Sequence, residues 1–242
     1  MTAIEFSNEF DVLYNNIMSN DAPGLNEYEK SVLLTKAQEE IVKNYFDPNG
    51  NKYRQGLDDS PKRQIDFSEL IRVGEGTLNP NASSITFSPR ASVYDLPADL
   101  FLIINESVKT DRGLKTVVPV SYQDYARLMS RPYKEPVAYQ AWRITATSTK
   151  TSQVAVELIV NNYETIQNYK VRYIKRPQPI ITTDLAESYG PDLTIGGISG
   201  PSECELNPII HSEILQRAVE LAKAAYEEGS LQASVQLGQR SE

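Results

Sequence analysis

Cysteine and histidine are almost missing from this 242-residue chain, which contains one of each, Cys204 and His211. A single thiol excludes a disulfide within the chain and a cysteine-rich zinc site, which needs several thiolates around one ion. A Cys/His nucleophilic mechanism would have to use this one pair, and no Asn or Asp is obviously placed to orient the imidazole. We therefore interpret them as a packed thiol and a helix-surface histidine, and predict no catalytic residue.

Long apolar runs are missing as well. No window approaches the roughly 18 consecutive apolar residues of a membrane span. The first ten residues are acidic and lack the basic and apolar regions of a signal peptide. We expect no membrane contact and a protein that is made and kept in a cytoplasm-like compartment.

Sequence motifs for ligands are present only in part. His211-Ser-Glu213 matches half of the zinc deaminase signature, but the P-C-x-x-C half is missing. The loop Asp47–Asp58 resembles an EF-hand loop with its turn glycine misplaced and Asp instead of the bidentate Glu. Gly196–Gly200 lacks the Lys-Ser/Thr of a phosphate loop. We predict no metal ion and no cofactor.

Charge is unevenly distributed along a chain of ordinary globular composition, 40% hydrophobic and 23% charged. Residues 1–60 hold 5 Lys/Arg against 11 Asp/Glu, residues 61–181 hold 16 against 11, and residues 182–242 hold 3 against 10. The ends are acidic and the middle is basic. This favours head-to-tail contact between copies more than tight binding of DNA, because acidic surfaces repel phosphate.

Helical patterns lie towards both ends of the chain. Apolar spacing predicts a helix up to Ile17, and Asn26 with Glu29 forms a capping box for a second helix. Ser60-Pro61 predicts a third, shorter helix. Asn207-Pro208 should open the longest helix, which ends at Gly229.

The middle of the chain has a β pattern. Its short runs are rich in β-branched and aromatic residues and lie at 84–87, 101–108, 115–120, 141–147, 153–160 and 169–175. Ser121–Met129 should form a short helix across one face. These runs predict a mostly antiparallel sheet or small sandwich.

The predicted fold class is therefore α+β, with a β-rich insertion in a helical bundle formed by the N-terminal helices and a long C-terminal helix. We predict a helical bundle domain from residues 1–71 with 205–229 and a β-rich domain at 72–181. A Gly/Pro-rich loop at 182–204 and a flexible tail at 230–242 complete the chain.

The C-terminal helix is apolar over more than half its girth, so we expect it to be covered on two sides, by its own core and by a neighbouring subunit. The basic strand before it is a second candidate contact. The predicted partner interface consists of Leu215, Val219, Tyr226, Leu231, Val235, Leu237, Arg172, Lys175 and Arg176.

Several stretches together resemble a known family. They are Glu9–Asn16, Ala22–Ser31, Thr35–Val42, Asp59–Phe67, Tyr94–Pro97, Val118–Tyr122, Arg131–Pro136, Tyr173–Pro177, Leu206, His211–Ile214 and Ala218-Val219. In their order and texture they resemble a head-to-tail ring or adaptor protein of the crAss-like tailed bacteriophages that infect gut Bacteroidales.

The resemblance implies a non-enzymatic virion protein, made in the cytoplasm of the bacterial host. It implies a homo-oligomeric ring, a dodecamer, that docks beneath the portal protein and above further tail ring proteins. Genomic DNA would pass through the ring without specific binding. Adaptors of this class are helical bundles, often with a β insertion, and their C-terminal tails commonly reach into the portal.

Three other hypotheses remain open. The chain could be another virion ring, such as a lower tail ring, a stopper or a baseplate subunit. It could be a hydrolase that works through Cys204 and His211, which would need a reactive thiol. It could also be a DNA-binding module that uses the basic strand Tyr169–Arg176, which would show salt-dependent retention of DNA.

Overall fold

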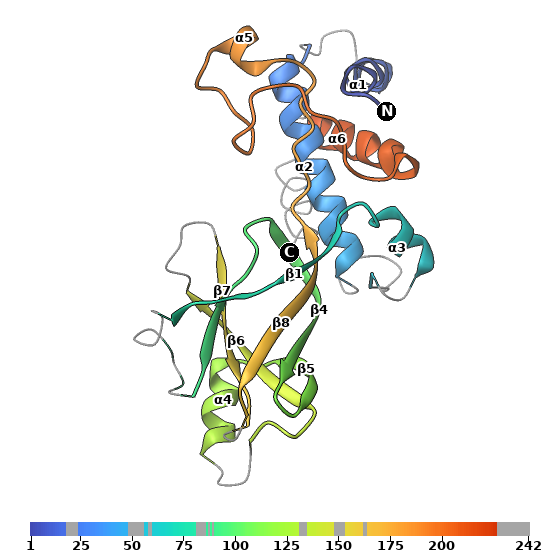
Figure 1. Cartoon of the computed structure of the whole chain (residues 1–242). Coiled ribbons are helices and arrows are strands. Elements are labelled where there is room, and N and C mark those ends of the chain that lie inside the picture. Colours follow the sequence, from blue (N-terminus) through green and yellow to red (C-terminus); the bar gives the residue numbers. More distant parts are fainter. Residues whose placement is uncertain are drawn as a thin grey trace. The chain divides into compact units, whose positions relative to one another are not determined.

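The computed structural model divides into two compact units (Figure 1). It describes residues 1–17, 24–47, 56–57, 60–80, 86, 88, 90–130, 135–147, 153–161 and 164–226. The helical unit combines Met1–Leu70 with Pro177–Glu242, and the β unit is Ile71–Arg176. Within the described residues, no helix combines the length and apolarity needed to cross a membrane.

The fold class predicted from the sequence is wrong. Among the described residues, the main element is one eight-stranded mixed sheet that forms a near-barrel, and it is accompanied by six α-helices. The C-terminal helix α6 (His211–Tyr226) has 16 residues, whereas α2 (Glu27–Phe46) has 20. The apolar pattern suggested a longer helix because Pro208–Ile210 continues it, but these residues form a separate 3-10 turn, η2.

The helical unit contains the first three helices of the chain and the last three helical segments. Its elements are α1 (Ala3–Ile17), α2, α3 (Pro61–Asp66), α5 (Leu185–Tyr189), η2 and α6. The capping box at α2 is confirmed, since the Asn26 side chain accepts from the Glu29 amide and the Glu29 carboxylate accepts from the Asn26 amide. Pro61 opens α3, but the side chain of Ser60 makes no capping bond. The predicted helix end at Gly229 lies outside the described residues.

The apolar residues of α6 as far as Ala222 are buried within the helical unit, where the helix packs against α1 and α2. Its buried apolar residues are Ile214, Leu215, Ala218, Val219, Leu221 and Ala222. As far as Ala222, the apolar girth of α6 is therefore accounted for without a neighbouring subunit.

A stripe of polar side chains on α2 holds the extended segment that follows the β unit. The Thr35 hydroxyl accepts from the Ile180 amide and the Ser31 hydroxyl accepts from the Thr182 amide, both at 3.1 Å. The Gln38 amide donates to the carbonyl of Gln178 at 2.8 Å. Four residues of a helix rise about 6 Å, and two residues of a strand rise about 6.6 Å. Polar residues three or four positions apart on α2 can therefore form hydrogen bonds with every second residue of an extended chain.

A buried lysine links α1 to α2. Lys30, with only 4% of its side chain exposed, lies 2.6 Å from Asp11 and 2.9 Å from Glu27. Burial works against the charged amine, but hydrogen bonds and attraction from the two carboxylates outweigh it and raise the pKa of Lys30. Glu27 also accepts from Ser7 and Thr182, so this one cluster joins α1, α2 and the extended segment.

The eight strands that the structure describes all lie in the β unit. They are β1 (Ile71–Glu75), β2 (Thr77–Leu78), β3 (Ser92–Asp95), β4 (Leu100–Thr110), β5 (Gly113–Pro119), β6 (Gln140–Thr147), β7 (Val154–Ile159) and β8 (Ile166–Lys175). Their order in the sheet is β1-β8-β4-β5-β6-β7-β3-β2. Among the described strands, only β5 and β6 pair in parallel. The segment that connects them contains helix α4 (Tyr122–Met129), which Ser121 caps as predicted.

The sheet closes on itself through one continuous segment. The two edge strands, β1 and β2, are separated only by Gly76, so the same segment pairs first with β8 and then with β3. A Cβ at Gly76 would lie 2.3 Å from the Tyr169 ring, and one at Gly74 would lie 2.8 Å from Pro97. The segment can pass this close to the core because both residues lack a side chain.

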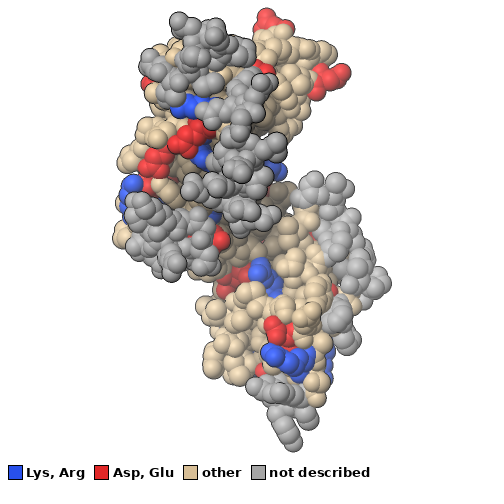
Figure 2. All heavy atoms as spheres, turned by 180° about the vertical axis from the view of Figure 1, so that it is seen from behind, with Lys and Arg blue, Asp and Glu red and all other residues tan. Residues whose placement is uncertain are grey.

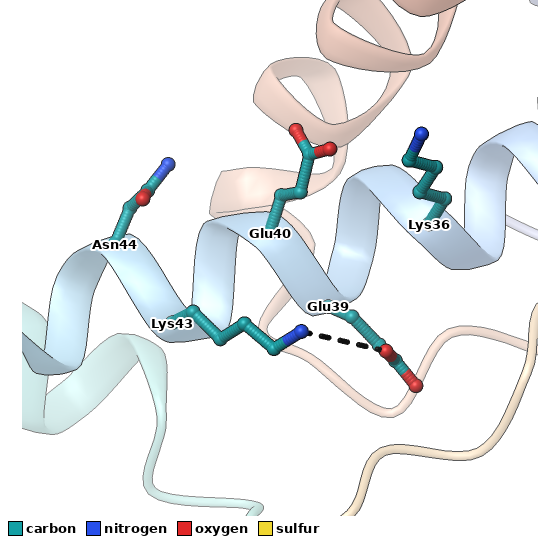
Figure 3. A pocket seen from close by; sticks show the side chains of 5 residues that line it. All are labelled: Lys36, Glu39, Glu40, Lys43 and Asn44. Atoms are coloured by element: carbon teal, nitrogen blue, oxygen red, sulfur yellow. Dashed lines mark ion pairs between the residues drawn. The ribbon is translucent and has the colours of Figure 1, made fainter. Parts of the chain in front are cut away.

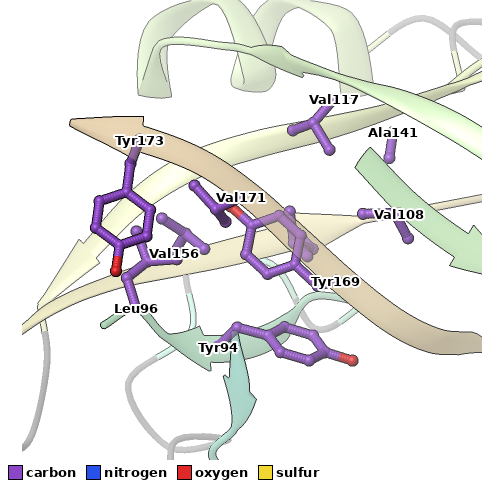
Figure 4. Close-up of a cluster of buried hydrophobic side chains, with 10 residues drawn as sticks. Tyr94, Leu96, Val108, Val117, Ala141, Val156, Tyr169, Val171 and Tyr173 are labelled. Carbon is purple, nitrogen blue, oxygen red and sulfur yellow. The ribbon is translucent and has the colours of Figure 1, made fainter. Parts of the chain in front are cut away.

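The interior of the near-barrel is apolar and aromatic (Figure 4). Its buried residues are Tyr94, Leu96, Val108, Val117, Ala141, Val156, Leu158, Tyr169, Val171 and Tyr173. Tyr94 and Tyr169 meet edge to face with ring centroids 5.5 Å apart. On the outside, α4 covers a second cluster that includes Trp142 and Ile144.

The described residues of the β unit include two ion pairs with little exposure to solvent. Lys115 lies 2.7 Å from Glu164, with 1% and 4% of their side chains exposed, and Thr110 donates to the same carboxylate. Burial acts to raise the pKa of Glu164, but the hydrogen bonds from Lys115 and Thr110 outweigh it and hold the pKa below its ordinary value. Glu106 pairs with Arg143 and accepts from the Tyr169 hydroxyl, although burial leaves its pKa raised.

The substitution Gly76→Ala should destabilise the protein by about 1–3 kcal/mol, because the new methyl group collides with a buried ring that a hydrogen bond to Glu106 holds in place. Denaturant unfolding measures this. The control Gly200→Ala, whose Cβ would meet nothing within 4 Å, should change the free energy of unfolding by less than about 0.5 kcal/mol. Equal effects of the two substitutions would contradict the close approach.

The substitution Glu164→Gln should lower the free energy of unfolding at pH 7 by about 3 kcal/mol, because it leaves the Lys115 ammonium buried and unpaired. The folded pKa of Glu164 is lower than the ordinary 4.5, so its stabilisation is complete above that pH and lost as the pH falls through the folded pKa. The variant should therefore lose less stability than the original protein on acidification. As a control, Arg127→Met removes the exposed ion pair with Asp124 and should lower the free energy of unfolding by less than about 0.5 kcal/mol. A loss as large as that of Glu164→Gln would contradict the distinction between exposed and buried ion pairs.

Candidate assembly surfaces

The thiol and the imidazole are engaged in structural hydrogen bonds. The Cys204 thiol donates to Gln38 at 3.2 Å. Nε2 of His211 donates to the Leu206 carbonyl at 2.8 Å, and its Nδ1 lies 2.9 Å from the Met1 amine. The imidazole is 3% exposed and also packs against Phe6, so it is a buried residue and not the helix-surface histidine that the sequence suggested.

Burial sets the protonation of both groups. It raises the pKa of Cys204 to about 11, so the thiol is protonated at neutral pH. It also lowers the pKa of His211; the Leu206 hydrogen bond opposes this shift and the Met1 ammonium adds to it. A protonated thiol and an imidazole with both nitrogens engaged are a poor nucleophile and base, which weakens the hydrolase alternative.

Both residues border an open groove of about 430 Å³ in the helical unit. Four glutamates line the same groove, namely Glu5, Glu69, Glu203 and Glu205. Nothing in the groove aligns a nucleophile with a base, so its main property is negative charge.

The incomplete ligand motifs gain little support from the structure. Glu213 accepts a hydrogen bond of 2.5 Å from the Tyr45 hydroxyl. Among the residues that the structure describes, no group of three or more His, Cys, Asp or Glu side chains could hold a metal ion. Most of the EF-hand-like loop after Asp47 lies outside the described residues. Gly196 and Gly197 have φ of 59° and 83° and form a turn between Ile195 and Ile198.

A second pocket, of about 270 Å³, lies along α2 (Figure 3). It is lined by Lys36, Glu39, Glu40, Lys43 and Asn44. Lys43 lies 4.0 Å from Glu39, and Arg217 of α6 lies 2.8 Å from Glu40. Opposite charges thus compensate one another here, and the pocket offers no field of one sign to a charged ligand.

The predicted interface residues have different positions in the structure. Leu215 and Val219 are buried inside the helical unit. On and after β8, Arg172 and Lys175 are half-buried and Arg176 is exposed. The Tyr226 side chain and Leu231, Val235 and Leu237 lie outside the described part of the chain. The assignment of these nine residues to an interface stays a prediction.

The two units carry opposite net charge. The helical unit has 10 Lys/Arg against 23 Asp/Glu, a net charge of −13, and the β unit has 14 against 9, a net charge of +5. Figure 2 shows acidic and basic side chains intermixed on one face of the molecule, so neither sign of charge covers that face evenly. A contact that uses this difference must therefore depend on local patches.

Comparison with known proteins decides the family. The family model described as phage tail ring protein 3/4 matches residues 1–234. The chain belongs to this phage tail ring protein family. It is 76% identical to Ring protein 4/5 of Bacteroides phage crAss001 over all 242 residues and the whole length of that protein. It is also 31% identical to Ring protein 3 of the same phage, over 92% of this chain and 95% of that protein.

Membership in this family confirms the resemblance to crAss-like phage ring proteins and the general prediction of a virion ring structural protein. The functional features of a ring protein are surfaces that meet other subunits. The sequence pattern predicted one such surface in part, through the alternating cations of β8, and this assignment stays a prediction. It gave no sign of the strands that join β8 in the same face, because register between distant strands cannot be read from one sequence.

Cys204 should react slowly with thiol reagents in the folded protein. With its pKa raised to about 11 it carries little thiolate at pH 8, so labelling should be about tenfold or more slower than in denaturant. The labelling rate of the folded chain should keep rising well above pH 9. A folded thiol that reacts as fast as the unfolded one would contradict this assignment and revive the hydrolase alternative.

Proposed function

We propose that this chain assembles into a homo-oligomeric ring in the head-to-tail connection of a crAss-like phage virion, where it helps to join capsid and tail. The observation that carries the proposal is the end-to-end similarity to Ring protein 4/5. A closed ring of identical subunits requires a heterologous interface, in which one patch meets a different patch of the next copy. The opposite charges of the two units supply such a pair.

The same charges suit a channel for DNA. Acidic residues of the helical unit that face the channel would repel the phosphates and let the genome pass without adhering. Basic residues of the β unit would then be used in contacts with neighbouring subunits. The chain acts in this proposal as a structural element and not as an enzyme.

The position in the virion has two candidate answers. The resemblance in sequence favours an adaptor of twelve copies directly beneath the portal, with the C-terminal tail reaching the portal. The family description as a tail ring protein favours a ring further along the tail. Both candidates use the same ring and differ in the ring's neighbours.

The purified chain should form rings at low ionic strength, because opposite charges drive the contact and salt screens them. Sedimentation velocity and negative-stain electron microscopy measure the species present. High salt should shift the population towards smaller species. A monomer under all conditions, with or without the portal protein, would contradict the proposed ring.

Deletion of residues 230–242 should leave folding and ring formation unchanged and weaken binding to the portal, if the ring lies beneath it. Co-sedimentation of the truncated and full-length chains with the portal protein measures the difference. Unchanged binding would reject the role of the C-terminal tail in portal docking. No binding by either chain would reject the portal position and support a ring further along the tail.

A further inference from the structure

Within the β unit, helix α4 packs on only part of the outer surface of the near-barrel, as far as the described residues show. The cluster beneath α4 covers the outside of β6 and β7, through Trp142, Ile144 and Ile159. The outside of the adjacent strands β1, β8, β4 and β5 instead carries exposed residues. The sheet register determines which residues these are.

Alternation along each strand sorts the side chains. Tyr169, Val171 and Tyr173 of β8 point into the core, so Lys170 and Arg172 point outwards. Val108 of β4 is in the core, which places Lys109 outside, and Lys115 and Val117 of β5 face inwards, which places Leu114 outside. In β1, Val73 is directly opposite Arg172 and therefore shares its face.

These residues form what we call the basic sheet face: Val73, Lys109, Leu114, Lys170 and Arg172. Its apolar members are unusually open for their type, with Val73 69% and Leu114 72% exposed. Its cations lie between them, and the one carboxylate in the face, Glu75, is 3.9 Å from Lys170. An apolar pair with cations between suits a protein partner that is acidic and partly apolar.

Helix α1 of the helical unit presents a surface of that kind. Its 15 residues contain three acids and no Lys or Arg. One side of α1 is buried through Phe6, Phe10 and Tyr14, and the opposite side is exposed. We call this side the acidic helix face: Ile4, Glu5, Asn8, Glu9 and Val12, of which Ile4 is 68% and Val12 59% exposed.

Helix α1 is long enough for the basic sheet face, and its acidic helix face, from Ile4 to Val12, covers about 12 Å of that length. From Val73 to Leu114 the basic sheet face crosses three strand spacings and is offset by four residues along the strands, so its diagonal is about 19 Å. A helix of 15 residues is about 22 Å long. The helix can therefore lie along the whole diagonal and bring both glutamates to the three cations.

We propose that the basic sheet face of one copy binds the acidic helix face of the next copy, and that this is the contact that closes the ring. The inference rests on the proposed function and names the surfaces that it uses. The two faces are different patches of one chain, as a heterologous interface requires. Exposed apolar residues at the two ends of each face would exclude water there, and the charges between them would fix the direction of the contact.

Charge reversal and its rescue test the pairing. The sheet variant Lys109→Glu/Arg172→Glu and the helix variant Glu5→Lys/Glu9→Lys should each raise the concentration for half-assembly by about tenfold or more. The chain with all four substitutions should return to within about threefold of the original value. The matched controls Arg127→Glu on α4 and Glu187→Lys on α5 should leave assembly unchanged. Circular dichroism and thermal melting establish that each variant is folded.

The pairing would be overturned if folded variants with one changed face assemble normally, or if the chain with all four substitutions does not recover assembly. Neither result would contradict the proposed ring. A protein that never self-associates would overturn both the pairing and the proposed function. If the sheet variant assembles normally but loses salt-dependent retention of duplex DNA, the basic sheet face binds nucleic acid and the proposed contact is wrong.

Discussion

The antiparallel pairing of β1 with β8 is the constraint on which the rest of the structure depends. It places Ile71 opposite Ile174, so the chain enters and leaves the β unit at neighbouring points. The residues before Ile71 and after Arg176 can then belong to one helical unit although about a hundred residues separate them. Loop closure over such a length is costly, and an extended ladder between the two ends offsets that cost.

The same pairing explains two unusual features of the sequence. Because β1 continues directly into β2, one segment must cross from β8 to β3 over the aromatic core, and Gly74 and Gly76 make that crossing possible. After the β unit, the chain does not form a ladder but runs along α2, where Thr35 takes the place of a strand neighbour. Each unit therefore has a well-defined interior, and this interior holds the outer surface of the unit in a fixed arrangement that other molecules can bind.

Sequence reasoning worked where a signal is local. The caps at Asn26 and Ser121 and the strong β runs from β4 to β8 were predictable because each depends on a few adjacent residues. It failed where the cause is distant. Gly74 and Gly76 resemble strand breakers unless the rings above them are known, so β1 and β2 were missed. The short strand β3 was missed as well, and the fold class was wrong. The apolar girth of α6 suggested a partner because its two covering helices could not be inferred.

The proposed assembly surfaces show the same limit. Alternating cations in β8 are visible in the sequence, but a face made from four strands depends on register. The residues that attract attention first, Cys204 and His211, are used to hold the helical unit together. What distinguishes the protein is the placement of charge and exposed apolar residues on two folded units, which is a property suited to assembly.

The central claim is that copies of this chain form a ring through two different faces. A cryo-electron microscopy reconstruction of a virion that contains the chain tests it most directly. The account predicts a ring around the tail axis in which α1 of each subunit lies on the outside of β1, β8, β4 and β5 of its neighbour. Subunits related by local two-fold axes, or density for the chain away from the axial rings, would contradict it.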